Sequence, residues 1–269
     1  MVSIICPVYC HTEDHKSYLA EALESVAAQT YRETELVVVD DSSPIDIGPI
    51  VQATEGLPPT RVLRSLANLG HAEARNVGIR AAEGELIAFL DHDDVWLPEK
   101  LAKQVAALEA EPEAAMVFCD VEIIRCGRDV GPLGKTPYID QSKVPARPSL
   151  VWFLTHSNCV ITVSAVLVRR KTMVDIDLFD SRYSTSDDYD AWIKILARAP
   201  ILHLAETLAR YRLHAHNVNY SADHLIDNRL LTALFLDVRR NLRPLDQARL
   251  LPTLARKLAG RVYWTLRRR

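Results

Sequence analysis

The chain has 269 residues, of which 48% are hydrophobic and 25% are charged, and this composition excludes intrinsically disordered and fibrous proteins. The net charge of -3 argues against a protein that binds nucleic acid over its whole surface. The charge is unevenly distributed, because residues 239–269 hold ten basic residues and a single acid, Asp246. The rest of the chain is therefore distinctly acidic.

Five cysteines, with no Cys-x-x-Cys pair, are an odd number for disulfide pairing. We expect buried free thiols in a reducing compartment. The sequence opens as a strand, without the basic and apolar regions of a signal peptide. The longest apolar run, 159–168, is interrupted by Thr162 and Ser164 and is shorter than the about 20 residues that span a bilayer. These features predict a cytoplasmic protein.

Runs with strand and helix periodicity alternate along the first 124 residues. Apolar β-rich runs predict strands over 2–8, 35–39, 60–64, 85–90 and 115–124. Apolar residues at helical spacing predict helices over 17–29, 47–54, 71–82 and 98–110. This alternation predicts an α/β fold with a mostly parallel central sheet and helices on both faces.

The second half is less regular. Residues 127–148 are rich in Gly and Pro and predict a long loop, of the kind that often forms a lid or a mobile segment. A strand is expected over 160–168, a helix over 188–197 and a strand over 201–204. From Ser221 the pattern is helical, with one helix through Arg240 and another after Pro244.

Unusual residues follow three of the predicted strands. These segments are Pro7-Val8-Tyr9, Asp40-Asp41-Ser42-Ser43 and Asp91-His92-Asp93-Asp94. Open α/β sheets bind ligands at the carboxyl ends of their strands, so we expect these segments to line a site. The sequence holds neither G-x-G-x-x-G nor G-x-x-x-x-G-K-[ST], which argues against a dinucleotide-binding site or a P-loop.

Of these segments, the one with Asp91 and Asp93 points most specifically to one kind of chemistry. Two carboxylates two residues apart after an apolar strand can converge on one Mg²⁺ or Mn²⁺ ion, which takes its other ligands from water and substrate phosphates. Like charges this close raise each other's pKa values unless a cation is present. The alternative is a capped turn at a strand-to-helix junction.

Asp41 and Tyr9 also allow two interpretations. Asp40-Asp41 can simply close a strand with a turn, or Asp41 can accept a hydrogen bond from a nucleobase, since an ionised carboxylate only accepts. Tyr9 can stack on that base or belong to the core.

Further motifs accompany the three strand-end segments, namely Glu24–Tyr31, Asn68-Leu69-Gly70, Ala74-Arg75-Asn76-Val77-Gly78, and Trp96 with Pro98. In this order across 2–101, the motifs resemble those of a family 2 glycosyltransferase with the GT-A fold. More loosely, Ser186–Trp192 is similar to the family's E-D-x-D-x-W block, with Asp187 where Glu is usual. Tyr211–His214, with Asn217 and Ser221, resembles its Y-R-x-H segment.

The resemblance implies a nucleotide-diphosphate-sugar site and a metal ion. For the nucleotide it implies Pro7, Tyr9, Asp41, Asn68, Arg75 and Asp91. For Mn²⁺ or Mg²⁺ it implies Asp91, Asp93 and His214, although His214 can equally be a structural hydrogen-bonding residue. It further implies that Asp188 is the catalytic base, whereas a bare helix N-terminus would also favour an acid at this position. Cys10 departs from the family, which often has Asn there.

The implied reaction is inverting, metal-dependent hexosyl transfer, most readily from a UDP-sugar to a hydroxyl acceptor. A lipid-linked or polysaccharide glycan of cell-surface glycan synthesis is the expected acceptor. Two alternatives stay open, namely a GT-A-like nucleotide-binding scaffold with little activity and a nucleotidyltransferase. The second would need a Gly- and Lys/Arg-rich phosphate loop near the first strand, where the sequence offers only Lys16.

The expected organisation is a transferase domain over 1–220, with a nucleotide-binding half (1–100) and an acceptor-binding half (101–220), followed by a basic helical extension over 221–269. Within 254–269, apolar residues recur every fourth position beside Tyr263 and Trp264. This pattern suits an amphipathic helix on an anionic membrane, which would place the protein peripherally on the inner face. A helix packed on the domain is the equal alternative.

Overall fold

The computed structural model describes residues 1–125, 140–156, 158–183, 185–214, 224–240, 242, 244–253 and 255. Its strands are β1 (Val2–Val8), β2 (Thr34–Asp40), β3 (Thr60–Arg64), β4 (Leu86–Phe89), β5 (Val95–Trp96), β6 (Met116–Arg125), β7 (Val166–Arg169) and β8 (Ile201–Leu213). Its α-helices are α1 (Glu13–Ala27), α2 (Gly48–Ala53), α3 (His71–Ala81), α4 (Lys100–Ala110), α5 (Leu150–His156), α6 (Arg170–Asp175), α7 (Asp187–Leu196), α8 (His224–Arg240) and α9 (Pro244–Arg249).

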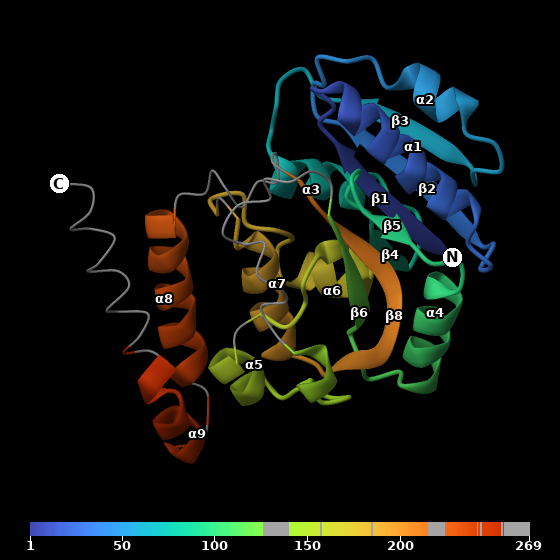
Figure 1. Cartoon of the computed structure of the whole chain (residues 1–269). Coiled ribbons are helices and arrows are strands. Elements are labelled where there is room, and N and C mark those ends of the chain that lie inside the picture. The colour runs from blue at the N-terminus through green and yellow to red at the C-terminus, as the bar shows by residue number, and fades with distance from the viewer. Residues whose placement is uncertain are drawn as a thin grey trace.

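The strands form one sheet in the order β3-β2-β1-β4-β7-β6-β8-β5, with helices on both of its faces (Figure 1). β1 pairs in parallel with β2 and β4, and β2 pairs in parallel with β3. β7 runs antiparallel to β4 and β6, while β6 and β8 are parallel. The sheet is thus mixed and mostly parallel, as expected. The chain order reverses between β1 and β4, which is where such sheets open a crevice at the strand ends.

Two core layers enclose the sheet because successive residues of a strand point to opposite faces. On β1, Ile4 packs with the apolar residues of α1 and α4, whereas Ile5 packs with those of α3 and α7. Residues 36–39 of β2 are fully buried and alternate between the two layers in the same way. Burial on both faces explains why these strands read as continuous apolar runs.

The predicted strand over 160–168 is wrong in its first part. Only β7 is a strand, and Val163–Ala165 forms a 3₁₀ turn instead. The Thr162 hydroxyl accepts a hydrogen bond from the Ser164 amide at 3.2 Å and donates to Asp94 at 2.9 Å. These local side-chain bonds compete with the β-ladder, and an apolar, β-branched sequence does not reveal them.

Other differences concern short or extended elements. β8 continues to Leu213, well past the predicted end at residue 204. The helices α5 and α6 and the two-residue strand β5 were not predicted. β8 carries the chain from the far side of the sheet back to the strand ends, so its length decides which residues reach the site.

Several predictions concern residues outside the described ranges. They include most of the loop over 127–148, the positions of Asn217 and Ser221, the boundary near residue 220, and nearly all of 254–269. Within the described part, none of the helices combines the length and the apolar character needed to cross a membrane. Four described cysteines, at 6, 10, 119 and 159, are buried free thiols as expected.

At Gly78, α3 lies close against the sheet. A Cβ atom at this position would lie 2.3 Å from Cγ2 of the buried Ile5 and 3.3 Å from Cγ2 of Val39. We therefore expect Gly78→Ala to lower the free energy of unfolding by about 1–3 kcal/mol, as overpacking does, in spite of alanine's better helix propensity. Urea denaturation measures this change.

The matched control is Gly48→Ala, where the new Cβ would meet only the side chain of Asp46. Its effect should stay within about 0.5 kcal/mol, as for most surface substitutions. Equal stability of the Gly78→Ala variant and the wild type would contradict the close approach of α3 to β1.

Candidate active site

A cavity of about 450 Å³ opens at the carboxyl ends of β1, β2 and β4. Its walls include eight of the nine residues expected at the site, namely Pro7, Tyr9, Asp41, Asn68, Arg75, Asp91, Asp93 and Asp188. The ninth, His214, is not part of the cavity wall but contacts Asp93, since its Nε2 lies 2.8 Å from Oδ2 of that residue. The fold therefore gathers residues that are spread over more than 200 positions of the sequence.

Asp41 organises the wall that follows β2. Its two carboxylate oxygens accept the backbone N–H groups of Leu69 at 2.7 Å and Gly70 at 2.9 Å. Gly70 has a φ of 81°, a conformation that glycine adopts at little cost. These bonds place the Asn68–Gly70 turn against the strand end. An ionised carboxylate has about four acceptor sites, so Asp41 keeps capacity for a ligand.

The neighbouring Asp40 has a different role. It is buried, accepts the Ser43 amide at 2.9 Å and pairs with Arg64. The two interpretations of the Asp40-Asp41 pair are therefore divided between its members: Asp40 closes the turn, and Asp41 lines the cavity. Tyr9 is 37% exposed, so the alternative that it belongs to the core is wrong.

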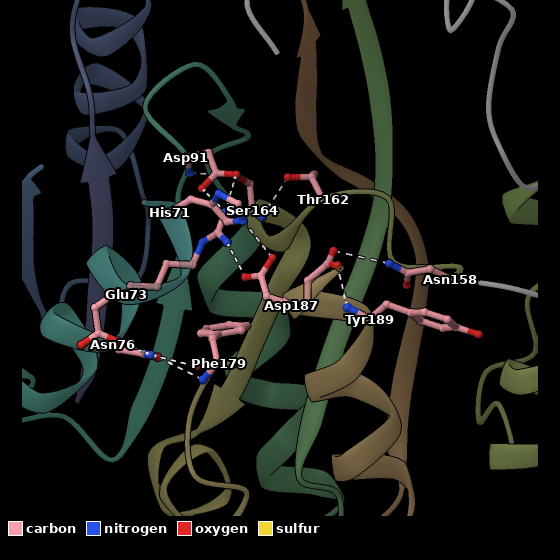
Figure 2. A network of polar contacts seen from close by, with 12 residues as sticks. His71, Glu73, Asn76, Asp91, Asn158, Thr162, Ser164, Phe179, Asp187 and Tyr189 are labelled. Atoms are coloured by element: carbon pink, nitrogen blue, oxygen red, sulfur yellow. Dashed lines mark hydrogen bonds and ion pairs between the residues drawn. The ribbon is translucent and has the colours of Figure 1, made fainter. Parts of the chain in front are cut away.

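The buried Arg75 joins Asp91, in the turn after β4, to Asp187 on α7, and Figure 2 shows these two carboxylates close together. Nη2 of Arg75 donates to both oxygens of Asp91, at 2.9 and 3.1 Å, and Nη1 donates to Oδ2 of Asp187 at 3.1 Å. Burial by itself would lower the pKa of Arg75, but the charges of Asp91 and Asp187 outweigh it and raise the pKa. Arg75 is thus a permanent cation in the wall.

Asp93 is held by β8. Besides the contact with His214, its backbone carbonyl accepts Nε of Arg212 at 2.7 Å. Burial works to raise the pKa of Asp93, but the hydrogen bond from His214 and the charges of His92 and His214 hold this pKa below its ordinary value. The next residue, Asp94, accepts the Arg212 amide at 3.0 Å. Arg212 and His214 together therefore fix the turn that contains Asp93 and Asp94.

The strand-end carboxylates fit a divalent cation by their chemistry. Asp91 and Asp93 both line the cavity, and Mg²⁺ and Mn²⁺ prefer carboxylate ligands, with water and phosphate oxygens completing the shell. Within the described ranges, no group of three His, Cys, Asp or Glu side chains forms a ready-made cage. One or two carboxylates with an open remainder is the arrangement that leaves room for a substrate's phosphates.

The first two residues of α7 have opposite electrostatic environments. Asp187 is fully buried and accepts Nε2 of His71 at 2.9 Å and Nη1 of Arg75 at 3.1 Å. Burial favours the neutral acid, but the hydrogen bond from His71 and the charges of His71 and Arg75 keep the pKa of Asp187 below its ordinary value. This carboxylate is a counterion with no proton to exchange.

Asp188 lines the cavity beside it. Burial, followed by the charge of Asp187, raises the pKa of Asp188 to about 7, with Arg75 and His71 opposing this rise. Its Oδ1 accepts the Tyr189 amide at 2.6 Å, and its Oδ2 accepts Nδ2 of Asn158 at 3.4 Å. A carboxyl whose pKa lies near neutrality can take up and release a proton at working pH. Neighbouring acids with divergent pKa values are typical of an acid–base site.

The sequence reasoning missed two residues in this region, His71 and Asn158. His71 could have been noticed, because it stands four residues before Arg75 and so shares its helix face. Asn158 had no signal, since it follows a short helix and precedes an apolar run.

The sequence of the chain is similar to those of known glycosyltransferases. The model of the family "Glycosyl transferase family 2" matches residues 3–168. The Escherichia coli UDP-Glc:alpha-D-GlcNAc-diphosphoundecaprenol beta-1,3-glucosyltransferase WfaP is 28% identical over 224 residues, which cover 81% of this chain and 80% of that protein. Some relatives are longer, and the chain spans 34% of a Rickettsia felis glycosyltransferase with 31% identity.

Solved structures show the likeness of the fold. S. aureus TarS in complex with UDP-GlcNAc superposes with a TM-score of 0.74 at 23% identity, covering 96% of this chain and 71% of that one. A mannosyltransferase from Pyrobaculum calidifontis, in complex with GDP-Man and Mn²⁺, gives a TM-score of 0.65 at 20% identity, covering 97% and 75%. The fold is the GT-A fold, as the sequence predicted.

The raised pKa of Asp188 has a consequence for stability. The unfolded carboxyl loses its proton near its ordinary pKa of 3.8, while the folded one keeps it until about pH 7. The unfolded chain therefore binds fewer protons between these values, and this group's contribution to stability is lost as the pH rises from about 4 to about 7.

Asp188→Asn removes the carboxyl and its ionisation. We expect the variant to be more stable than the wild type at pH 8, by on the order of a few kcal/mol, and the difference to shrink toward pH 4. Denaturation at both pH values measures it, with Asp46→Asn at an exposed position as the control. A pH-independent difference would contradict the assignment.

Proposed function

The chain belongs to glycosyl transferase family 2, and on that premise we propose that it transfers a sugar, with inversion, from a nucleotide-diphosphate sugar to a hydroxyl group of a glycan acceptor. The observation that carries this proposal is the arrangement around Arg75. On one side, Asp91 and Asp93 stand at a strand end where a cation and a diphosphate can bind. On the other, Asp188 faces the same cavity with a pKa of about 7.

The proton chemistry belongs to Asp188. As the acceptor oxygen attacks the anomeric carbon, its O–H bond breaks and Asp188 takes the proton. The bond between the anomeric carbon and the diphosphate breaks at the same time, and the electron pair leaves with the diphosphate. A single displacement of this kind inverts the anomeric configuration. A positioned base of this kind contributes about 10²–10⁴-fold to the rate.

A divalent cation, Mn²⁺ or Mg²⁺, is proposed to be held by Asp91 and Asp93, with His214 fixing Asp93 or joining it as a ligand. When bound, such a cation stabilises the negative charge that develops on a leaving diphosphate. The complex of the Pyrobaculum mannosyltransferase with GDP-Man and Mn²⁺ supports this assignment. Arg75 holds Asp91 in place beside that charge.

UDP is the nucleotide that we propose. The exposed ring of Tyr9 and the carboxylate of Asp41 suit a stacked base with an N–H donor. The UDP-GlcNAc complex of TarS and the UDP-Glc named for WfaP are consistent with this choice. The diphosphoundecaprenol-linked acceptor in the WfaP name supports a lipid-linked glycan as the acceptor here. Peripheral membrane contact through 254–269 stays a prediction.

Asp188→Asn tests the proposal, because it keeps the size of the side chain and removes the base. We expect transfer from a nucleotide sugar to fall by about 10²–10⁴-fold, while calorimetry finds the affinity for the nucleoside diphosphate within about twofold of the wild type. The control is Asp175→Asn, an acid on α6 that pairs with Lys171 away from the cavity.

Two results would contradict this role. Loss of nucleotide binding in Asp188→Asn would mean that the residue belongs to the nucleotide site. Unchanged transfer would mean that another group accepts the proton. A wild-type protein that binds nucleotide sugars without transferring them to any glycan would favour the scaffold alternative.

A further inference from the structure

His71 is the first residue of α3, and its imidazole bridges two parts of the cavity wall. Its Nε2 lies 2.9 Å from Oδ1 of the buried Asp187, and its side chain is 26% exposed and lines the cavity. The preceding Gly70 is fixed by its bond to Asp41. The backbone next to His71 and one of its ring nitrogens are therefore both held in place. Figure 2 shows the pair of His71 and Asp187.

The bond to Asp187 decides which ring nitrogen carries the proton. Asp187 is ionised, because the charge of Arg75 and the hydrogen bond from His71 stabilise its carboxylate, and an ionised carboxylate only accepts hydrogen bonds. Nε2 of His71 must therefore be the donor, and in the neutral ring Nδ1 is left as an acceptor. In the described part of the chain Nδ1 has no hydrogen-bond partner, and it is not a buried atom. It is open to a ligand in the cavity.

The position of His71 indicates what that ligand is. A transferred sugar must lie between the diphosphate, near Asp91 and Asp93, and the base, Asp188. Arg75 spans this interval, because its guanidinium contacts Asp91 at one end and Asp187 at the other. His71 stands one helical turn before Arg75 on the same face of α3. Its imidazole thus lines the cavity at the Asp187 end of this interval.

We propose that His71 is a specificity-determining residue whose Nδ1 accepts a hydrogen bond from a hydroxyl group of the transferred sugar, with Asp187 fixing the tautomer that makes this possible. The inference rests on the proposed function, since it assigns a contact within that site. It gives Asp187 a second role besides pairing with Arg75. It also selects for sugars that carry a hydroxyl donor at the contacted position, because a bound sugar without that donor would cover the acceptor and leave it unpaired, which weakens binding.

The test compares ligands that differ only in the sugar. Calorimetry with Mn²⁺ measures the affinities of UDP and UDP-glucose, and of GDP and GDP-mannose, for the wild type and for His71→Phe. Phenylalanine keeps a planar ring and removes both nitrogens. We expect roughly 2- to 10-fold weaker binding of the nucleotide sugar, as for loss of one hydrogen bond, and an unchanged affinity for the nucleoside diphosphate.

His71→Gln serves as the conservative variant, since its amide can donate to Asp187 and still offer an acceptor oxygen. It should recover part of the lost affinity for the nucleotide sugar, and it remains informative if His71→Phe folds poorly. The control is His156→Phe, an exposed histidine on α5 that stacks on Trp152 outside the cavity. It should bind both ligands as the wild type does.

The outcomes separate this inference from the proposal on which it rests. Equal weakening of nucleoside diphosphate and nucleotide sugar in His71→Phe, or no weakening of either, would overturn the sugar contact alone. A wild type that bound neither pair of ligands would overturn the proposed function, and the inference with it. Selective weakening for the nucleotide sugar, with partial recovery in His71→Gln, would establish the contact.

Discussion

The site depends on one buried cation, the guanidinium of Arg75. It ties three elements that are distant in the sequence, namely α3, the turn after β4, and the first turn of α7, through its bonds to Asp91 and Asp187. A buried charge is tolerated only when partners offset its lost hydration. Asp91 and Asp187 offset the lost hydration of Arg75, and Arg75 in turn stabilises their negative charges. Their mutual dependence fixes the distance between the two ends of the cavity.

The position of Arg75 also gives Asp187 and Asp188 different pKa values. Asp187 pairs with Arg75, accepts a hydrogen bond from His71 and stays ionised. Burial and then the repulsion from Asp187 raise the pKa of Asp188 to about 7, against the weaker opposing effect of Arg75. Two adjacent residues of the same type thus become a fixed charge and a proton acceptor. The role of Asp188 as a proton acceptor lowers the stability of the folded protein at neutral pH, a common trade-off between stability and activity.

Much of this site could be predicted because parallel strands end at one edge of a sheet. The apolar runs before Tyr9, Asp41 and Asp91 located the strand ends, and the alternation of helices and strands brought them together. The partners of Arg75 could not be predicted, since Asp187 is 112 positions away and no pattern links the two. The pair of His71 and Asp187 was hidden in the same way. Tertiary packing alone decides which polar groups meet across such separations.

Binding of a nucleoside diphosphate with a cation tests the central claim most directly. Thermal unfolding of the protein with UDP, GDP or CMP, each with and without Mn²⁺, reports which ligand the folded state binds, because a ligand at 100 times its Kd stabilises by about 2.7 kcal/mol. We predict stabilisation by a diphosphate, UDP above all, that requires Mn²⁺ and disappears in Asp93→Ala. Equal stabilisation without Mn²⁺, its persistence in Asp93→Ala, or its absence with every diphosphate would contradict the account.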